Sequence, residues 1–377
     1  MINVFADKYL RNIADYLPDK VKLNFYDPAD GLPAKDSAMD ALLIRTVHTI
    51  DEPTLARLPD TLEFLATASA GTDHVNIDLL RSRDIAFAYA AGCNARSVAE
   101  YVATVLLIWS ELKKEILEDK RIGIVGVGHV GSEVQKLCEA LGISPCLYDP
   151  PKAERDPDFE SATLEDVLSS DILTFHTPLT HQGPHSTYHW MDQEKLQSRS
   201  YDLIINTSRG GVVDEQALLK AHTTGRLADF IIDVWENEPV FNDLTAQNAF
   251  IKTPHIAGYS IQAKNRASRM VAESLCDHFS LNMPEDGRQA GKETVELSDT
   301  SHEDPFSLVE LLTQLHPVIE YQKELKKLMG MVPQKKAQAF NRLRSEFPLR
   351  NEFRFMQLNE NLITKHTQLD KLGFLSE

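Results

Sequence analysis

The side chains best suited to chemistry in this 377-residue chain are an arginine, a glutamate and a histidine in three late segments. Arg209 stands in NTSRGG, directly after the apolar run DLIIN, and its planar guanidinium can hold a carboxylate through two hydrogen bonds. Glu238 stands in DVWENEP and His255 in TPHIAGY. A histidine can take the proton of a hydroxyl group while hydride leaves the same carbon, and a carboxylate on its other ring nitrogen fixes the tautomer. We therefore expect Arg209, Glu238 and His255 to be catalytic residues for oxidation of a hydroxy acid.

A nucleotide-binding turn lies upstream of these segments. Gly126, Gly128 and Gly131 form a G-x-G-x-x-G motif between the apolar run RIGIV and the amphipathic stretch HVGSEVQKLCEAL. The first glycine permits a tight turn, the second lets the backbone approach a pyrophosphate, and the third lets the helix pack closely on the strand. A further apolar run ends at Asp149, whose carboxylate can accept hydrogen bonds from both ribose hydroxyls and would repel a 2′-phosphate. Two prolines and no arginine follow it, which favours NAD over NADP.

The elements that position these residues alternate between short apolar runs and amphipathic stretches, the pattern of α/β domains with parallel sheets. One long helix is expected at residues 97–114, apolar at its centre and typical of a buried helix. Before this helix we expect strands at residues 2–6, 22–26, 41–46, 63–69 and 85–90. After it we expect strands at residues 121–128, 144–149, 171–177, 202–208 and 229–235.

Composition and charge exclude several classes of function. The net charge of −17 argues against nucleic acid or an anionic membrane as the main partner. The N-terminal residues lack the pattern of a signal peptide, and the longest apolar stretch, residues 101–109, is shorter than the roughly 20 residues that span a bilayer. The four cysteines have no Cys-x-x-Cys spacing, which argues against a zinc site or a disulfide framework. We expect a cytoplasmic protein with reduced thiols and no bound metal.

The C-terminal part of the chain departs from this pattern. A polar, acidic stretch at residues 284–304 indicates a linker or a long surface excursion. Beyond it, a tail of about 70 residues is too small for a sizeable core of its own, so we expect it to pack on the body or on a second subunit. The tail is locally basic at Lys335, Lys336, Arg342, Arg344 and Arg350.

Taken in order, the glycine motif and the N-x-x-R-G, D-V-x-x-x-E-P and P-H-x-x-G segments resemble the D-isomer-specific 2-hydroxyacid dehydrogenases. The resemblance covers roughly residues 1–285 and includes SAGTDHV, which looks like the substrate-binding loop of that family. It implies an α/β fold of two doubly wound, Rossmann-like domains with parallel sheets and a cleft between them, plus a small C-terminal α+β dimerisation domain. The implied domains are residues 1–97 with 257–285 for the substrate, 98–256 for NAD, and 286–377 for the linker and dimerisation.

The resemblance also implies roles for single residues. In that family the arginine, glutamate and histidine of these motifs form the active site, which corresponds to Arg209, Glu238 and His255. Matching position by position implies contacts to NAD from Asp149, Thr177, Asp233 and Gly258, and contacts to the substrate from Thr46, Ser69 and Tyr259.

Within the family, the segments TASAGTDHV, AGCNARSVAEYV and HIAGYS most resemble members that oxidise a phosphorylated four-carbon hydroxy acid as homodimers. Arg45 and Arg350 are our candidates for the phosphate, Arg350 by reaching the site of a neighbouring subunit. A phosphoglycerate dehydrogenase or a hydroxypyruvate reductase would carry the same three catalytic residues. An NAD(H)-sensing scaffold protein would keep the same fold without turnover. The loops and the tail favour the phosphorylated four-carbon substrate.

Overall fold

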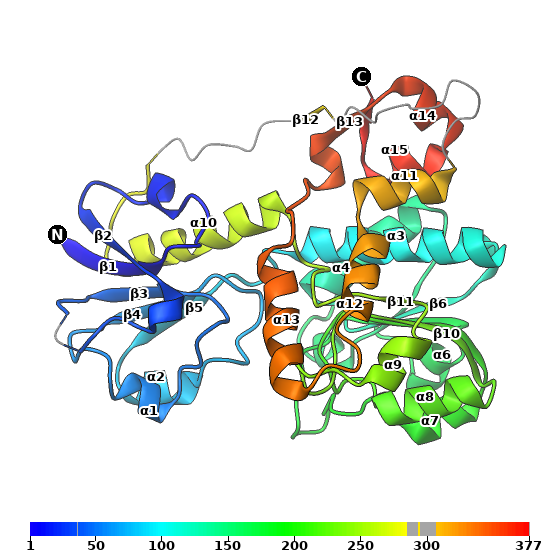
Figure 1. Ribbon diagram of the computed structural model, residues 1–377, viewed down its shortest axis with the longest axis horizontal. Helices are drawn as coiled ribbons and strands as arrows, with labels where there is room; N and C mark the ends of the chain where they lie inside the picture. Colours follow the sequence, from blue (N-terminus) through cyan, green and yellow to red (C-terminus); the bar gives the residue numbers. More distant parts are fainter. Residues whose placement is uncertain (36, 285–292, 295–306, 377) are drawn as a thin grey trace. The chain divides into compact units, whose positions relative to one another are not determined.

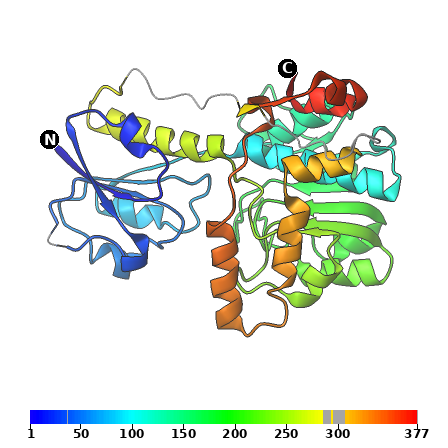
Figure 2. The same ribbon diagram turned by 45° about the horizontal axis from the view of Figure 1, so that its top comes forward.

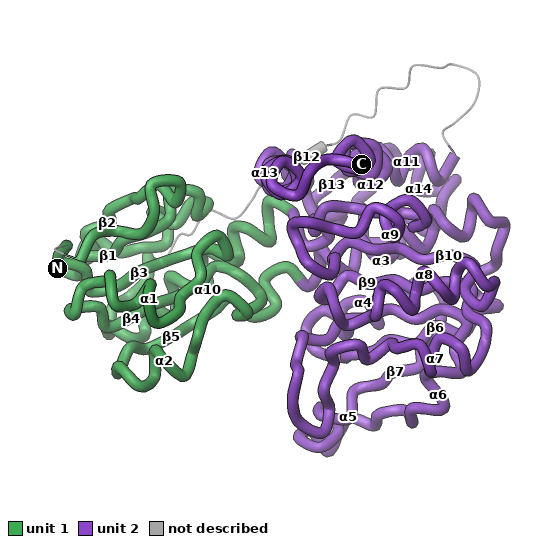
Figure 3. Tube along the Cα trace, turned by 60° about the horizontal axis from the view of Figure 1, so that its bottom comes forward, with its two compact units in different colours: residues 1–94, 260–291 green, residues 95–259, 292–377 purple. Residues whose placement is uncertain are grey.

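The computed structural model describes residues 1–35, 37–284, 293–294 and 307–376. The chain divides into two compact units, drawn in different colours in Figure 3. Unit 1 contains residues 1–94 and 260–291, and unit 2 contains residues 95–259 and 292–377. The first unit is thus built from two separate stretches, with its boundaries at 94 and 260 where the sequence predicted 97 and 257. The predicted linker at 284–304 lies almost wholly outside the described residues.

Unit 1 is built on a five-stranded parallel sheet with the strand order β2-β1-β3-β4-β5 (Figure 1). Its strands are β1 (Ile2–Asp7), β2 (Val21–Tyr26), β3 (Ala41–Ile44), β4 (Phe64–Thr67) and β5 (Ala86–Tyr89). Its helices are η1 (Ile13–Tyr16), η2 (Pro28–Asp30), α1 (Glu52–Leu55), α2 (Ile77–Ser82) and α10 (Ile261–His278). The strand order reverses between β1 and β3, so their carboxyl ends form a switch point of the kind where α/β sheets bind ligands.

Unit 2 contains a six-stranded parallel sheet with the order β11-β10-β9-β8-β6-β7. Its strands are β6 (Ile122–Val125), β7 (Cys146–Tyr148), β8 (Ile172–Phe175), β9 (Tyr201–Asn206), β10 (Leu227–Ile232) and β11 (Ile251–Lys252). Its helices before the tail are α3 (Ala95–Lys113), η3 (Leu117–Asp119), α4 (His129–Ala140), α5 (Pro150–Ala153), α6 (Leu164–Leu168), α7 (Gln193–Ser198), α8 (Glu215–Thr223) and α9 (Asp243–Asn248). The switch point of this sheet lies between β6 and β8.

Both faces of the unit 2 sheet are buried, which explains why its strands are apolar at successive positions. Ile124 and Ile205 face a core that includes α3 and α4. The alternate residues Val125 and Ile204 face a second core that includes α7 and α8. Side chains that alternate along each strand therefore close two layers of helices over one sheet. The α/β class with parallel sheets is confirmed.

The tail belongs to unit 2 and contributes to both of these cores. Its helices are α11 (Leu308–Leu315), α12 (Val318–Lys326), α13 (Pro333–Ser345), η4 (Phe353–Phe355), α14 (Glu360–Lys365) and α15 (Thr367–Leu372). The strands β12 (Glu293–Thr294), β13 (Met356–Leu358) and β14 (Leu375–Ser376) form a small third sheet. Helices α12 and α13 run side by side (Figures 1 and 2). Phe340 of α13 is fully buried in the core that also holds Trp235.

Within the described ranges, the protein has no helix with the length and apolar character needed to cross a membrane.

Candidate active site

The glycine turn follows β6 and leads into α4, as the sequence predicted. Gly126 adopts a φ of 88°, and its N–H donates to the carbonyl of Tyr148 at 2.9 Å. A Cβ on Gly126 would lie 2.7 Å from Cγ2 of Thr177, and a Cβ on Gly131 would lie 2.0 Å from the carbonyl oxygen of Gly126. A Cβ on Gly128 would meet nothing within 4 Å among the described residues. The first and third glycines are therefore required by packing, whereas the backbone at Gly128 leaves room for a ligand.

Two polar side chains flank this turn at the ends of β7 and β8. Oδ2 of Asp149 accepts the N–H of Val127 at 2.7 Å, and Oδ1 accepts the N–H of Lys152 at 3.0 Å. A carboxylate has further lone pairs, so these bonds leave it able to accept from ribose hydroxyls. The hydroxyl of Thr177 is buried and has no partner among the residues that the structure describes. An orphaned hydroxyl and an open glycine beside the switch point fit a bound dinucleotide.

Asp233 follows β10 and organises the segment that carries His255. Its Oδ1 accepts the hydroxyl of Thr253 at 2.6 Å and the N–H of Ile256 at 2.8 Å, and its Oδ2 accepts the N–H of Ala257 at 3.0 Å. Burial raises the pKa of Asp233 despite these bonds and the neighbouring His255. The N–H of His255 in turn donates to the carbonyl of Asp233 at 2.7 Å, and His255 adopts a φ of 58°. The carboxylate of Asp233 thus orders the backbone on both sides of His255 and fixes the position of this histidine.

The structure brings Glu238 and His255 together. Nδ1 of His255 lies 2.8 Å from Oε2 of Glu238, while Oε1 of Glu238 accepts the N–H of Trp235 at 2.9 Å. Burial would raise the pKa of Glu238, but the charge of His255, its hydrogen bond and the charge of Arg344 lower it overall. An ionised Glu238 keeps the proton of neutral His255 on Nδ1, so Nε2 is the nitrogen that can accept a substrate proton.

Arg209 lies in the loop after β9, close to the segment that holds Glu238. The side-chain amide of Asn206 donates to the carbonyl of Arg209 at 3.0 Å and so fixes the loop. A Cβ on Gly210 would lie 1.8 Å from the carbonyl oxygen of Trp235, which explains why glycine must follow this arginine. The tight approach of the two loops places Arg209 beside the Glu238 segment within unit 2.

The other predicted substrate residues, Arg45, Thr46 and Ser69, belong to unit 1. They follow the adjacent strands β3 and β4 at the carboxyl edge of its sheet, where Ile44 pairs with Thr67. Nε of Arg45 donates to Oδ2 of Asp7 at 2.8 Å, so this guanidinium lies at the switch point between β1 and β3.

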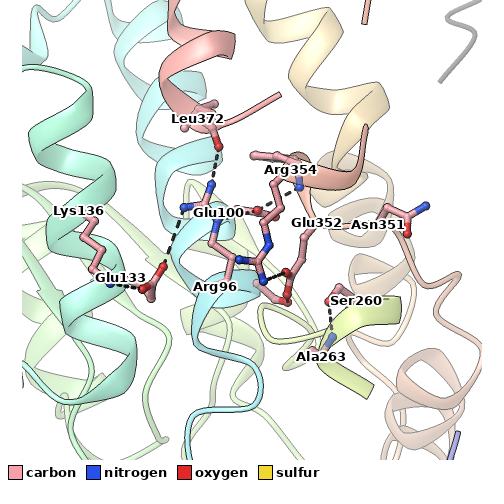
Figure 4. A network of polar contacts seen from close by, with 12 residues as sticks. Arg96, Glu100, Glu133, Lys136, Ser260, Ala263, Asn351, Glu352, Arg354 and Leu372 are labelled. Carbon is pink, nitrogen blue, oxygen red and sulfur yellow. Dashed lines mark hydrogen bonds and ion pairs between the residues drawn. The ribbon is translucent and has the colours of Figure 1, made fainter. Parts of the chain in front are cut away.

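Arg350 requires a correction. Its Nη1 lies 2.6 Å from Oε2 of Glu100, and the two side chains are 4% and 0% exposed. Nε of Arg96 binds the other oxygen of Glu100 at 2.9 Å, in the polar network of Figure 4. A buried guanidinium that neutralises a buried carboxylate cannot also reach out to another subunit. Arg350 therefore links the tail to α3, and the prediction that it binds phosphate is withdrawn.

Gly258 and Tyr259 follow His255, and Tyr259 meets a residue that the sequence analysis did not single out. The hydroxyl of Tyr259 is one of the groups that raise the pKa of the Arg344 guanidinium of α13, so the two side chains are neighbours. The ring of Tyr259 also packs edge-on against Phe347, with the centroids 5.8 Å apart. In the sequence, Arg344 is recognisable only as part of a basic segment of the tail. Its four-residue spacing from Phe340 is the signal that could have shown which face it shares.

One other cluster has the side-chain types of a metal site. His189, Asp214 and Glu236 offer ligand atoms within 4.8 Å of one another among the described residues. Nε2 of His189 lies 2.6 Å from Oε1 of Glu236, and Nδ1 lies 3.7 Å from Oδ2 of Asp214. The two carboxylates thus face different nitrogens of one ring, which cannot both bind the same ion. We assign no metal to this cluster.

Comparisons with known proteins show the family to which the chain belongs. Residues 95–257 match the family described as D-isomer specific 2-hydroxyacid dehydrogenase, NAD binding domain. The chain is 35% identical over 362 residues to erythronate-4-phosphate dehydrogenase of Proteus mirabilis, covering 92% of each chain. It is 38% identical over 349 residues to the protein of that name from Edwardsiella ictaluri, covering 89% of this chain and 88% of the relative.

Solved structures share the fold at lower sequence identity. D-lactate dehydrogenase from Aquifex aeolicus, complexed with NAD and lactic acid, superposes with a TM-score of 0.59 at 21% identity. A glyoxylate/hydroxypyruvate reductase from Sinorhizobium meliloti superposes with a TM-score of 0.62 at 20% identity. Each alignment covers 74% of this chain and 95% of the solved chain.

Proposed function

The chain belongs to the family of erythronate-4-phosphate dehydrogenases, within the D-isomer specific 2-hydroxyacid dehydrogenases, and on that premise we propose the reaction that it catalyses. The protein oxidises the C2 hydroxyl of 4-phospho-D-erythronate with NAD and forms 2-oxo-3-hydroxy-4-phosphobutanoate, a step of pyridoxal 5′-phosphate (vitamin B6) biosynthesis. The observation that carries this assignment is the match over 92% of both chains, tail included, combined with a histidine–carboxylate pair 2.8 Å apart.

Residues of unit 2 form the proposed binding site for NAD. The turn at Gly126, Gly128 and Gly131 holds the pyrophosphate of NAD, and Asp149 binds its ribose. A bound NAD supplies the acceptor for the hydride. Thr177, Asp233 and Gly258 are the further NAD contacts of this proposal, Thr177 through its buried and unpartnered hydroxyl. NAD rather than NADP follows from the carboxylate of Asp149, which repels a 2′-phosphate.

Arg209 and His255 act on the substrate. Arg209 holds the C1 carboxylate through its planar guanidinium and thereby orients C2. His255 accepts the C2 hydroxyl proton at Nε2 because Glu238 engages Nδ1 at 2.8 Å. Glu238 then stabilises the imidazolium that forms. Thr46 and Ser69 supply hydroxyl groups for the substrate, and Arg45 supplies positive charge for its phosphate.

A substrate panel tests the assignment. Purified protein is given NAD and 4-phospho-D-erythronate, 3-phospho-D-glycerate or D-glycerate, with a 2-oxo acid present as an alternative acceptor to regenerate NAD. We expect a preference of at least about 100-fold in kcat/KM for the four-carbon phosphate, because a site that hydrogen-bonds a substrate hydroxyl rejects acids that do not present it by at least that factor. Preference for a control acid would show that the protein is a dehydrogenase with a different substrate. Bound NADH without turnover of any acid would indicate a sensor and contradict the assignment.

We also propose that the protein is a cytoplasmic homodimer formed through its tail. All four cysteines are free thiols, which supports the cytoplasmic location. Val332, just before α13, is 59% exposed, which supports an apolar contact between the tails of two subunits. Sedimentation velocity of the wild type and of Val332→Glu tests the dimer, which should weaken in the variant. A wild-type protein that sediments as a monomer at micromolar concentration would contradict it.

A further inference from the structure

We propose that Arg344 of the tail binds the phosphate group of the substrate and thereby makes the tail part of the active site. This inference rests on the proposed function, because it assigns a residue to the phosphate of that substrate. It concerns unit 2 alone, to which Arg344, Tyr259, Glu238 and His255 all belong.

The register of α13 places Arg344 on the buried face of the helix. Lys336 and Phe340, eight and four residues before it, are 5% and 0% exposed. Nζ of Lys336 donates to Oδ1 of Asp243 at 2.6 Å, and the ring of Phe340 lies 6.0 Å from that of Phe241. Residues four apart share one face of a helix, so Arg344 lies on the face of α13 that packs against the rest of unit 2.

Just beyond the helix, Phe347 fixes the position of Tyr259 next to Arg344. Its ring lies 5.8 Å from Tyr259 and 4.4 Å from Tyr321 of α12. Phe347 is three residues from Arg344, so this ring contact places Tyr259 near the Arg344 guanidinium, whose pKa Tyr259 helps to raise. Tyr259 follows His255 by four residues in the same loop, and the charge of Arg344 also lowers the pKa of Glu238, so the guanidinium lies near the catalytic pair.

The guanidinium keeps hydrogen-bonding capacity in this position. An arginine side chain has five N–H donors, and a single neighbouring hydroxyl could engage only part of them. Nε of Arg344 is buried and has no partner within the described part of the chain. A buried donor without an acceptor is destabilising, which is a reason to expect an acceptor from a ligand there.

The charge balance of the site calls for a cation besides Arg209 and Arg45, because Arg45 already pairs with the buried carboxylate of Asp7 at 2.8 Å. Glu238 and Asp233 both carry carboxylates at this segment, and the substrate brings a carboxylate and a phosphate. Arg209 is committed to the carboxylate of the substrate in the proposed reaction. Burial would lower the pKa of Arg344, but Tyr259, Glu238 and Asp233 raise it overall, so its positive charge is secure. A fixed guanidinium matches the geometry of a phosphate.

The test compares Arg344→Gln with a matched variant on the same helix. Arg342 is exposed and pairs with Glu346 at 2.8 Å, so Arg342→Gln should behave as the wild type. For Arg344→Gln we expect kcat/KM with 4-phospho-D-erythronate to fall about 10- to 100-fold, as for loss of charge-assisted hydrogen bonds. The same constant for unphosphorylated D-erythronate, or its inhibition constant if it does not turn over, should change less than about 3-fold. Arg344→Lys should recover part of the loss.

Further readouts separate the outcomes. NADH binding, followed by fluorescence, and the melting temperature should match those of Arg342→Gln. An equal loss with both acids would make Arg344 a positioning residue that acts through Tyr259 or Glu238, and would overturn the proposal, as would unchanged constants. A wild type that does not prefer the phosphorylated acid would instead overturn the proposed function.

Discussion

Replacing Glu238 with glutamine tests how the protein activates His255. Oε1 of Glu238 accepts a backbone N–H from Trp235 at 2.9 Å, and Oε2 accepts from Nδ1 of His255 at 2.8 Å. The N–H of Trp235 can only donate, so the glutamine must turn its oxygen toward Trp235 and its NH2 toward His255. Nδ1 must then accept a hydrogen bond, which moves the ring proton to Nε2. The variant keeps the shape of the site, but Nε2 of His255 then carries a proton and cannot accept one from the substrate.

The expected effect is large and confined to chemistry. A wrong tautomer of a catalytic histidine lowers kcat by about 10⁴-fold in serine proteases, where an aspartate holds the histidine. We expect a fall of roughly 10³- to 10⁴-fold in kcat here, which corresponds to about 4–5 kcal/mol. The dissociation constant of NADH should change by less than about 3-fold, because the glycine turn is untouched. Stopped-flow measurement of NADH formation, with fluorescence titration of NADH, gives both numbers.

A matched variant lies two residues away. Oε1 of Glu236 bonds Nε2 of His189 at 2.6 Å, so Glu236→Gln also removes a carboxylate from a histidine in the same segment. It should retain kcat within about 3-fold, since His189 has no part in the proposed reaction. If Glu238→Gln kept kcat within tenfold of the wild type, the reasoning about the tautomer would be refuted.

Three further predictions concern stability and the cofactor. Arg350→Ala should lower the free energy of unfolding by about 3–5 kcal/mol in urea titrations, because it leaves Glu100 buried without this guanidinium; a change below 1 kcal/mol would contradict it. Burial raises the pKa of the Glu215 carboxyl from 4.5 to about 7. Ionisation of this carboxyl therefore lowers the free energy of unfolding progressively as the pH rises from 4.5 to 7. Glu215→Gln should therefore gain up to about 3 kcal/mol at pH 8 and almost nothing at pH 4, and an equal gain at both would disprove the cause. Gly131→Ala should weaken NADH binding more than tenfold, because its Cβ would lie 2.0 Å from the carbonyl oxygen of Gly126; unchanged fluorescence titration would show that the turn adapts freely.

Much of the fold was predictable because local pattern and topology agree. The buried strands of both sheets are short apolar runs, and the helix predicted at 97–114 forms as α3 at Ala95–Lys113. The glycine turn was predictable because backbone conformation and close packing demand glycine at Gly126 and Gly131. The two-residue strand β11 has too little sequence to show a period, and it forms through pairing with β10.

The tail shows where sequence reasoning failed and why. Arg344 and Arg350 lie in one basic segment of the tail, and of the two only Arg350 was predicted to bind the phosphate. Only the packed structure distinguishes them, because Glu100, 250 residues away in the chain, neutralises Arg350. Arg344 instead lies beside Tyr259, a contact set by the docking of α13. Long-range partners of this kind leave no local period or motif.

The most direct test of the account uses 4-phospho-D-erythronate labelled with deuterium at C2. If C2 loses hydride to NAD while His255 takes the hydroxyl proton, the label must appear in the reduced nicotinamide, and mass spectrometry of the NADH will find one deuterium per turnover. His255→Ala should bind NADH as the wild type does yet form little labelled product. Product formed without deuterium in the NADH, or full turnover by His255→Ala, would contradict the account.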